Sequence, residues 1–505
     1  MTAKRFPYAL VALVSALSIN SAIALPIDWT GVFGVDTHLL NNVCRTKDNI
    51  PDKFDTNGDR ISGTEGTEGI TGDCGASFQT YIFKLQPQII VNDGVTLKGE
   101  LSSGYLRGGF AGDNATNGQN GTGGSYFFAS PAQRSGLNVN QMYMELYADT
   151  ALIRIGRMAR DYGLGIVFDG GTDAWDRFFT MYDGIDAEMK IGNFSVTPYY
   201  AKISSYQDTG TTARPAGARP AGGWDVRETG ITAKYDNKAR DLVVSLLYAK
   251  RFSEAKNSLY NNLPASSGAG SGSPRDLGKT EVTVIEPYAS KRWNKFKIAA
   301  EASIQSGDYG DVYNSGTKSR LNANAYIAEL KYDLNPKWEI GANLGQVSGD
   351  NGNSKKFEAA YLHPNYHIAD LMFRYSYPSF NEGGKSIFDA SITNAQFWKL
   401  YANYKTDKWT WKGAFVMANA LKTAKAGSRA YHHEENYSFT SNQKQKSDYG
   451  YEVDLGFDYR WNPNVIISGY YGYWFVGDYY AFSNKAKEIS VQNVHGGGLR
   501  ATLEF

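Results

Sequence analysis

The chain has 505 residues and lacks most features that mark a soluble enzyme or a helical membrane protein. It contains only two cysteines and six histidines, and the histidines form no convincing metal or catalytic site. After residue 24, no segment approaches the roughly 18 to 20 uninterrupted apolar residues that a membrane helix needs. The 52 basic and 51 acidic side chains nearly cancel, so the charge gives no sign of a nucleic-acid partner. Neither a Ser/His pair nor a nucleotide-binding loop is apparent, and we expect no enzyme.

The first 24 residues have the composition of a signal peptide. Lys4 and Arg5 precede a short apolar core, and "SAIA" at 21–24 supplies small residues at the cleavage positions. This apolar core is too short to span a bilayer, although an uncleaved N-terminal anchor is the alternative. The sequence therefore predicts a signal peptide over 1–24 and a mature, exported chain over 25–505.

The two cysteines, Cys44 and Cys74, lie in the mature part of the chain. In an exported protein, an isolated pair of cysteines favours a disulfide. Two free thiols are the alternative. We expect a Cys44–Cys74 disulfide that closes one long connection.

From residue 27 to the end, the chain repeats one pattern: about 18 extended runs in which apolar and polar residues alternate. Short connections with turn residues, such as 92–94, 149–150 and 335–337, alternate with long ones rich in Gly, Ser and Asn. The long segment 350–390 reads either as a loop or as two further strands. Because both chain ends fall on the short-turn side, the pattern is that of a single up-and-down sheet.

The run "DYGYEVDLGFDYRW" at 448–461 shows the pattern most clearly. Every odd position from Tyr449 to Trp461 is apolar or aromatic, and the carboxylates lie between them. A membrane barrel needs such strands, because hydrocarbon covers one face and water the other. Five tryptophans next to short turns would form the aromatic belt of a membrane interface: Trp293, Trp338, Trp409, Trp411 and Trp461.

We therefore predict an all-β fold: a closed antiparallel transmembrane β-barrel of about 18 strands over 25–505, with long extracellular loops. Sixteen strands are the alternative count. A β-sandwich also alternates, but it rarely needs strands this long or connections that divide so cleanly by length. Closure is required because an open edge in lipid leaves backbone groups unpaired at several kcal/mol each.

The whole mature chain resembles the bacterial outer-membrane porins. The even strand count, the alternation of short turns and long loops, and the C-terminal strand "GGGLRATLEF" ending in Phe505 carry this resemblance. It implies an outer-membrane location in a Gram-negative-type bacterium. It also implies recognition of the last strand by the barrel-assembly machinery, contact with outer-membrane lipids, and the possibility of a homotrimer.

The expected strand number also points to a function. Barrels of 16 to 18 strands leave an aqueous channel. The sequence thus predicts a porin for passive diffusion of small hydrophilic solutes and ions, with no cofactor. A substrate-selective channel for sugars or other nutrients, and a structural or adhesive outer-membrane protein, are the alternatives.

The segment 154–184 is the candidate constriction. Alternation places Arg154 and Arg160 in the lumen, and a bulge at Gly156 would turn Arg157 inward as well. The segment resembles the inward-folded third loop of porins in its position and its acidic residues. An ordinary solvated external loop is the alternative. The acidic residues expected to face the arginines are Asp161, Asp169, Asp173, Asp176, Asp186 and Glu188.

Between the cysteines, the segment 55–65 resembles the calcium loop of EF-hand proteins. Its ligands would be Asp55, Asn57, Asp59 and Glu65, which offer the hard oxygens that calcium prefers. The chain departs from the pattern because Arg60 replaces the turn glycine and Glu65 comes one residue early. An acidic surface loop is the alternative to calcium binding.

Overall fold

A computed structural model describes residues 27–43, 75–103, 107–110, 137–204, 226–253, 280–310, 313, 318–353, 355–376, 387–388, 390–434, 437–482, 484 and 491–505. The predicted signal peptide at 1–24, the Cys44–Cys74 disulfide and the calcium loop at 55–65 lie outside these residues. In the described part of the chain, no helix is long and apolar enough to cross a membrane.

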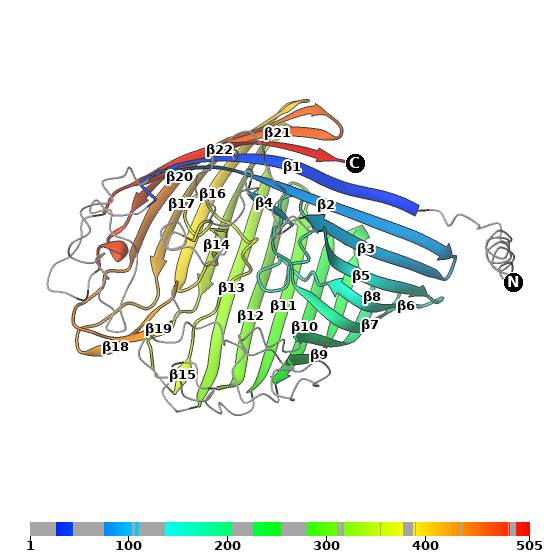
Figure 1. Cartoon of the computed structure of the whole chain (residues 1–505), viewed down its shortest axis with the longest axis horizontal. Coiled ribbons are helices and arrows are strands. Elements are labelled where there is room, and N and C mark those ends of the chain that lie inside the picture. The colour runs from blue at the N-terminus through cyan, green and yellow to red at the C-terminus, as the bar shows by residue number, and fades with distance from the viewer. Residues whose placement is uncertain are drawn as a thin grey trace, which may run out of the picture.

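Eighteen long strands of the described chain form one continuous wall. Each strand pairs antiparallel with the next, and the last pairs with the first, so the wall is closed (Figure 1). The strands are β1 (Ile27–Asn41), β2 (Ala76–Asn92), β3 (Val95–Ser103), β5 (Leu137–Tyr147), β6 (Ala151–Ala159), β7 (Met181–Ile191), β8 (Phe194–Ser204), β9 (Val226–Asn237), β10 (Leu242–Ser253), β11 (Thr280–Trp293), β12 (Phe296–Gly310), β13 (Ser319–Asp333), β14 (Trp338–Val347), β16 (Ala395–Lys405), β17 (Trp409–Ala420), β20 (Asp448–Asn462), β21 (Val465–Val476) and β22 (Val494–Glu504).

The barrel closes where β1 meets β22. The two strands pair in register from Val32 opposite Glu504 to Asn41 opposite His495. Beyond this ladder, the Gly31 amide donates a 2.7 Å hydrogen bond to the Phe505 carbonyl. A Cβ atom on Gly31 would lie 2.6 Å from the Phe505 ring, so the glycine makes room for the terminal aromatic residue.

Four shorter strands and two 3₁₀ turns lie outside the regular wall. β4 (Gly108–Phe110) pairs with β2, and β15 (Lys356–Phe357) pairs in parallel with β13. β18 (Ser428–His432) and β19 (Tyr437–Ser441) form a separate hairpin in the connection between β17 and β20. The turns are η2 (Lys238–Arg240) and η3 (Asp478–Ala481). In the described part of 350–390, the chain is a loop apart from the two-residue β15, and it adds no long strand to the barrel wall.

The two faces of the wall differ as the alternation predicts. On β20, Leu455 and Trp461 are 61% and 63% exposed on the outer face, whereas Glu452 is buried on the lumen side. The five tryptophans of the predicted belt are all exposed beside short turns, which confirms that they gather at one rim. The outer surface is therefore an apolar band bounded by aromatic side chains, as a bilayer requires.

Candidate functional site

The connection between β6 and β7, residues 160–180, folds into the lumen and crosses it. At one side, Arg177 Nη2 donates to Thr80 Oγ1 of β2 over 2.9 Å. At the other side, the Leu164 amide donates to the Glu301 carboxylate of β12. β2 is the second strand of the wall and β12 is the eleventh, so they stand half-way around the ring of 18. This loop therefore spans the full width of the barrel.

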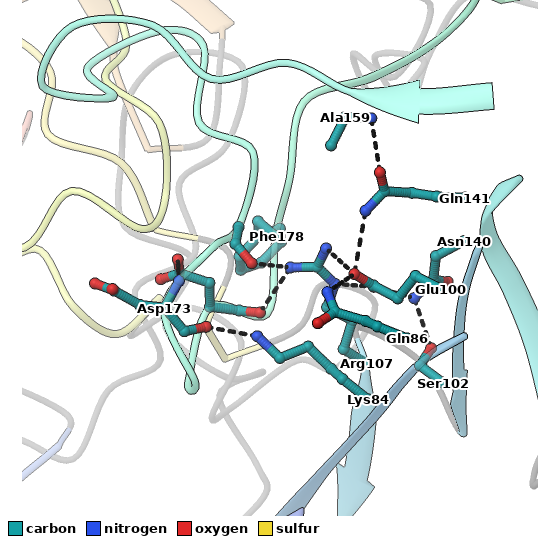
Figure 2. Close-up of polar contacts among 12 residues, drawn as sticks. Lys84, Gln86, Glu100, Ser102, Arg107, Asn140, Gln141, Ala159, Asp173 and Phe178 are labelled. Carbon is teal, nitrogen blue, oxygen red and sulfur yellow. Dashed lines mark hydrogen bonds and ion pairs between the residues drawn. The ribbon is translucent and has the colours of Figure 1, made fainter. Parts of the chain in front are cut away.

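Arg107 ties the inward loop to the wall. Its guanidinium contacts the Glu100 carboxylate of β3 at 2.7 and 3.0 Å and donates to the carbonyls of Gly171 and Asp176 at 2.8 and 3.2 Å. Figure 2 shows this side chain between the wall and the loop, with Lys84 reaching the loop alongside it. Arg107 is only 2% exposed, so its charge is satisfied entirely by these protein groups.

The connection between β14 and β16, residues 348–394, enters the lumen from another side. The amides of Leu371 and Met372 both donate to the Glu452 carboxylate of β20 at 2.7 Å. Tyr366 donates to Glu329 of β13 at 3.0 Å. A buried carboxyl group that accepts two adjacent amides fixes the backbone firmly, because both of its oxygens are bonded to the loop.

The two inward loops pack against each other. The His363 amide donates to the Ile166 carbonyl at 2.8 Å, and Asn365 Nδ2 donates to the Phe178 carbonyl at 2.9 Å. Their apolar side chains form a buried cluster in the middle of the barrel, which narrows the space left for water. This cluster includes Ile166, Phe168, Leu362, Ile368, Leu371 and Met372.

Where the two loops approach β22, three arginines gather around two aromatic rings. Arg177 and Arg500 both lie over the Trp175 ring, at 5.7 and 4.2 Å from its centroid. Arg374 and Arg500 both lie over the Tyr470 ring, at 4.6 and 5.8 Å. We call Arg177, Arg374 and Arg500 the arginine cluster. One arginine comes from each loop and one from the wall.

Two carboxylates pair directly with the arginine cluster. Arg500 Nη2 lies 2.7 Å from Asp36 of β1, and Arg374 Nη1 lies 3.0 Å from Asp370. Burial, with a further contribution from the neighbouring Arg500, lowers the pKa of Arg177 to about 10. At neutral pH the three guanidinium groups outnumber these two carboxylates. The electrostatic energy of the cluster therefore favours a bound anion over a bound cation.

A cavity of about 500 Å³ lies in the lumen beside the arginine cluster. Arg374, Arg500 and Tyr470 line one part of it, so two of the three guanidinium groups border open space. Asp370 of the second inward loop and the carboxylates and lysines of β13 to β20 line much of the rest: Glu329, Glu339, Asp454, Asp458, Lys399 and Lys412. A solute in this cavity would meet both signs of charge on the wall and paired guanidinium groups at one end.

Of the arginines predicted to form the constriction, two lie in the lumen, but they do not face the loop aspartates. Arg154 Nε contacts Asp186 on the adjacent β7 at 2.8 Å. Arg160 Nη1 contacts Glu228 of β9 at 2.6 Å and stacks over Tyr199. Arg154 is neutralised by a carboxylate on the adjacent strand and Arg160 by one on β9, three strands away along the wall, so neither sets up the expected field across an opening.

The prediction for Arg157 was wrong. Gly156 pairs with Tyr143 and Gly184 without a register shift, so no bulge forms there. Arg157 consequently stays on the outer face, where it contacts Asp183 at 2.8 Å and both side chains are about half exposed.

The predicted acidic residues fall into two groups. Asp169 and Asp173 belong to the inward loop, where Asp169 accepts from the Gly171 amide at 2.6 Å and the Asp173 carbonyl accepts from Lys84 at 2.5 Å. Asp176 accepts from the Asp173 amide at 2.8 Å. The others lie at the edges of the site: Asp161 is exposed where the loop begins, and Asp186 and Glu188 lie on the lumen face of β7.

Sequence reasoning missed the residues that hold the site together. Arg374 lies in a connection, where alternation assigns no face, and Arg107 lies beyond the end of β3, although the sequence pattern extends this strand to residue 108. Arg500 was placed in the lumen by its position in the last strand, but nothing in the pattern brings it to Arg177 and Arg374. In the part of the chain that the structure describes, no group of three or more His, Cys, Asp and Glu side chains could hold a metal ion.

Comparison with known proteins gives likenesses to solved structures only. No family model matches the chain, and no curated protein is significantly similar to it. The solved structures include Pseudomonas aeruginosa OccK2 in complex with glucuronate, with 11% identity, 95% of this chain and 98% of that chain covered, and a TM-score of 0.46. Pseudomonas aeruginosa OpdK with vanillate has 10% identity, coverage of 95% and 98%, and a TM-score of 0.47. A BenF-like porin from Pseudomonas fluorescens has 11% identity, coverage of 95% and 99%, and a TM-score of 0.46. At this level, the likeness says nothing of the solute.

The wall itself identifies the class of protein. It is closed and antiparallel, its outer face is an apolar band with an aromatic belt, and its inner face carries buried charges. Long connections gather at one end and tight turns at the other, as in outer-membrane barrels. The chain is a closed antiparallel β-barrel whose apolar, aromatic-bounded outer face is that of a transmembrane barrel.

Proposed function

We propose that the chain is a selective channel for small, negatively charged polar solutes. The observation that carries this proposal is the arginine cluster, whose three guanidinium groups meet where both inward loops reach the wall. Planar guanidinium groups bind carboxylates and phosphates with two parallel hydrogen bonds. A solute with one such group would be drawn to Arg374 and Arg500 at the edge of the cavity.

The narrowed lumen favours selectivity over general diffusion. A wall of 18 strands alone would enclose a wide aqueous channel, but the two inward loops and their apolar cluster occupy its middle. A solute therefore passes close to protein groups and exchanges contacts with them, which is how a pore discriminates among solutes. This favours the selective channel among the alternatives raised by the sequence, with an anion in place of a neutral sugar.

The test is the current through single channels in a planar bilayer. We expect the full mature chain to give steps with a reversal potential that shows anion preference, and a small carboxylate to block them more strongly than a neutral sugar of equal size. Replacing Arg374 by Gln should weaken the anion preference and the block several-fold, whereas Arg374→Lys should retain part of both.

The matched control is Arg460→Gln, which removes a lumen-facing cation outside the arginine cluster and should leave the block unchanged. Stronger block by the neutral sugar would favour a sugar channel. Large conductance steps without preference for either sign of ion would favour a general diffusion porin. A folded barrel without conductance would favour the structural or adhesive role. The expected homotrimer and the role of Phe505 in assembly stay predictions.

A further inference from the structure

Lys399 is a cation of the lumen wall that has no counter-ion in the part of the chain that the structure describes. It lies on β16 and borders the same cavity of about 500 Å³ that Arg374 and Arg500 line. The residues directly opposite it on the two neighbouring strands are Asn343 and Val416, which carry no charge. Among the described residues, no carboxylate lies within ion-pair distance of its ammonium group.

The carboxylates around the cavity are held by other groups. Asp458 contacts Lys412 at 2.7 Å, and Glu339 contacts two lysines of neighbouring strands at 2.5 Å each. Glu329 accepts a 3.0 Å hydrogen bond from Tyr366 of the second inward loop. These carboxylates therefore have partners of their own and do not neutralise Lys399.

Asp454 also borders the cavity and attracts Lys399 electrostatically, but the two groups form no ion pair. A Cβ atom on Gly472 would lie 2.9 Å from Asp454 Oδ1 and 2.8 Å from Glu452 Oε1. Both oxygens thus converge on this point of β21, and Asp454 Oδ1 is buried there. Because Asp454 is turned toward the wall, the ammonium group of Lys399 is left for a solute.

Lys399 and the arginines act on one region of the lumen. His367 of the second inward loop has an exposed side chain there. Desolvation inside the barrel, followed by the charges of Arg374, Arg500 and Lys399, lowers the pKa of His367 to about 3. The imidazole is therefore neutral at neutral pH, and the positive charge of this region comes from the three cations around it.

The cations nevertheless form two separate binding points. Arg374 and Arg500 lie over the Tyr470 ring of β21. Lys399 lies on β16, and β17 and β20 stand between the two strands. With strands about 4.8 Å apart, Tyr470 and Lys399 are separated by at least roughly 14 Å along the wall. One carboxylate at the arginines therefore leaves Lys399 unpaired.

We propose that the preferred solute carries two carboxylate groups, one bound by Arg374 and Arg500 and the other by Lys399. This inference rests on the proposed function and specifies its solute. The paired guanidinium groups bind the first carboxylate through parallel hydrogen bonds, whereas the ammonium group on its flexible stem is a point charge for the second. A dicarboxylate forms an ion pair that a monocarboxylate of equal length lacks, so Lys399 determines specificity among anions.

The test compares succinate with butyrate, which has the same number of carbon atoms and one carboxylate fewer. Single-channel current through the full mature chain is measured at a pH where all carboxyl groups of both acids are ionised. We expect succinate to block at a roughly tenfold lower concentration, a gain between that of an exposed ion pair and that of a desolvated one. Lys399→Gln should remove this advantage and leave the block by butyrate unchanged, whereas Lys399→Arg should keep most of it.

The matched control is Lys297→Gln, which removes a lysine of β12 outside the cavity lining and should leave both blocks unchanged. An equal block by the two acids in the unmodified chain would overturn the inference, as would a succinate advantage that persists in Lys399→Gln. In either case, an Arg374→Gln variant that weakens the block by butyrate would still support the anion channel. Failure of both acids to block, without anion preference, would remove the proposed function itself.

Discussion

At the scale of single residues, the lumen depends on buried charges whose partners come from distant parts of the chain. Arg107 joins the wall to the first inward loop, and Glu452 joins the wall to the second. Breaking a buried pair by removing one partner costs more than removing both, because one charge is left without compensation. These residues therefore fix where the loops lie.

Replacing Arg107 by Gln should destabilise the barrel by about 3–5 kcal/mol, because Glu100 would remain buried without its cation. It should also raise the conductance, since the loop loses its bonds through Gly171 and Asp176. The measurements are urea unfolding in lipid vesicles and single-channel current. The double variant Glu100→Gln/Arg107→Gln should recover much of the stability and keep the altered conductance. Recovery of both would show that Arg107 does not hold the loop.

The ion preference should change with pH through Asp176. Burial, with a contribution from the nearby Asp169, raises the pKa of Asp176 to about 7. Below this pH the carboxyl group is protonated and neutral, so the inward loop loses a negative charge and anion preference should increase from pH 8 to pH 6. Reversal potentials measure this. The Asp176→Asn variant should show the stronger anion preference at both pH 8 and pH 6. If its anion preference still changed with pH as in the unmodified chain, another group would be responsible.

At the scale of elements, each strand of the wall presents hydrocarbon-facing and lumen-facing residues in turn. Leu344 and Asn343 are neighbours on β14, yet Leu344 is 44% exposed on the outer face while Asn343 lines the lumen cavity. One step along the chain thus moves a side chain from lipid to water. The effect of a substitution therefore depends more on whether the position faces lipid or the lumen than on the identity of the residue replaced.

Leu344→Arg should cost about 2–4 kcal/mol in the free energy of unfolding, the range for an arginine at the middle of the bilayer face. Asn343→Arg should cost far less, because the cavity offers water and carboxylates. Urea titration of both variants in the same vesicles provides the comparison. Equal costs would contradict the assignment of the two faces.

The strands and their faces were predictable because alternation is a local pattern that repeats along every strand. The predicted short connections 92–94 and 335–337 correspond to the turns between β2 and β3 and between β13 and β14, with differences of one residue. The site was far less predictable. Arg374 lies in the segment 350–390, where no period assigns a face, and its neighbour Arg500 is more than a hundred residues away. Arg157 was placed wrongly because a glycine suggested a bulge that the continuous ladder excludes.

At the scale of the whole molecule, two inward loops turn a wide barrel into a narrow passage. The loops meet at the His363–Ile166 and Asn365–Phe178 bonds, so they act as one insert held by opposite walls. The hydrogen bonds between neighbouring strands can therefore stabilise the outer wall without the insert, while the insert determines which solutes pass.

Replacing 363–375 by a short Gly/Ser linker should widen the passage and increase single-channel conductance several-fold, with loss of anion preference because Arg374 is removed. The control is a comparable replacement in the β18–β19 hairpin, which lies at the loop end of the barrel (Figure 1). That variant should conduct as the unmodified chain does. Unchanged conductance after removal of 363–375 would show that ions pass along another route.

The pairing of β1 with β22 has a consequence for how the protein is made. Asp36 and Arg500 form a contact across the seam although 464 positions separate them in the chain. Until the final strand arrives, the sheet has two open edges whose amides and carbonyls would join any other strand they meet. A truncated copy is thus an aggregation hazard and never a smaller pore. Only a chain that includes the last strand can pair with β1 and close the barrel.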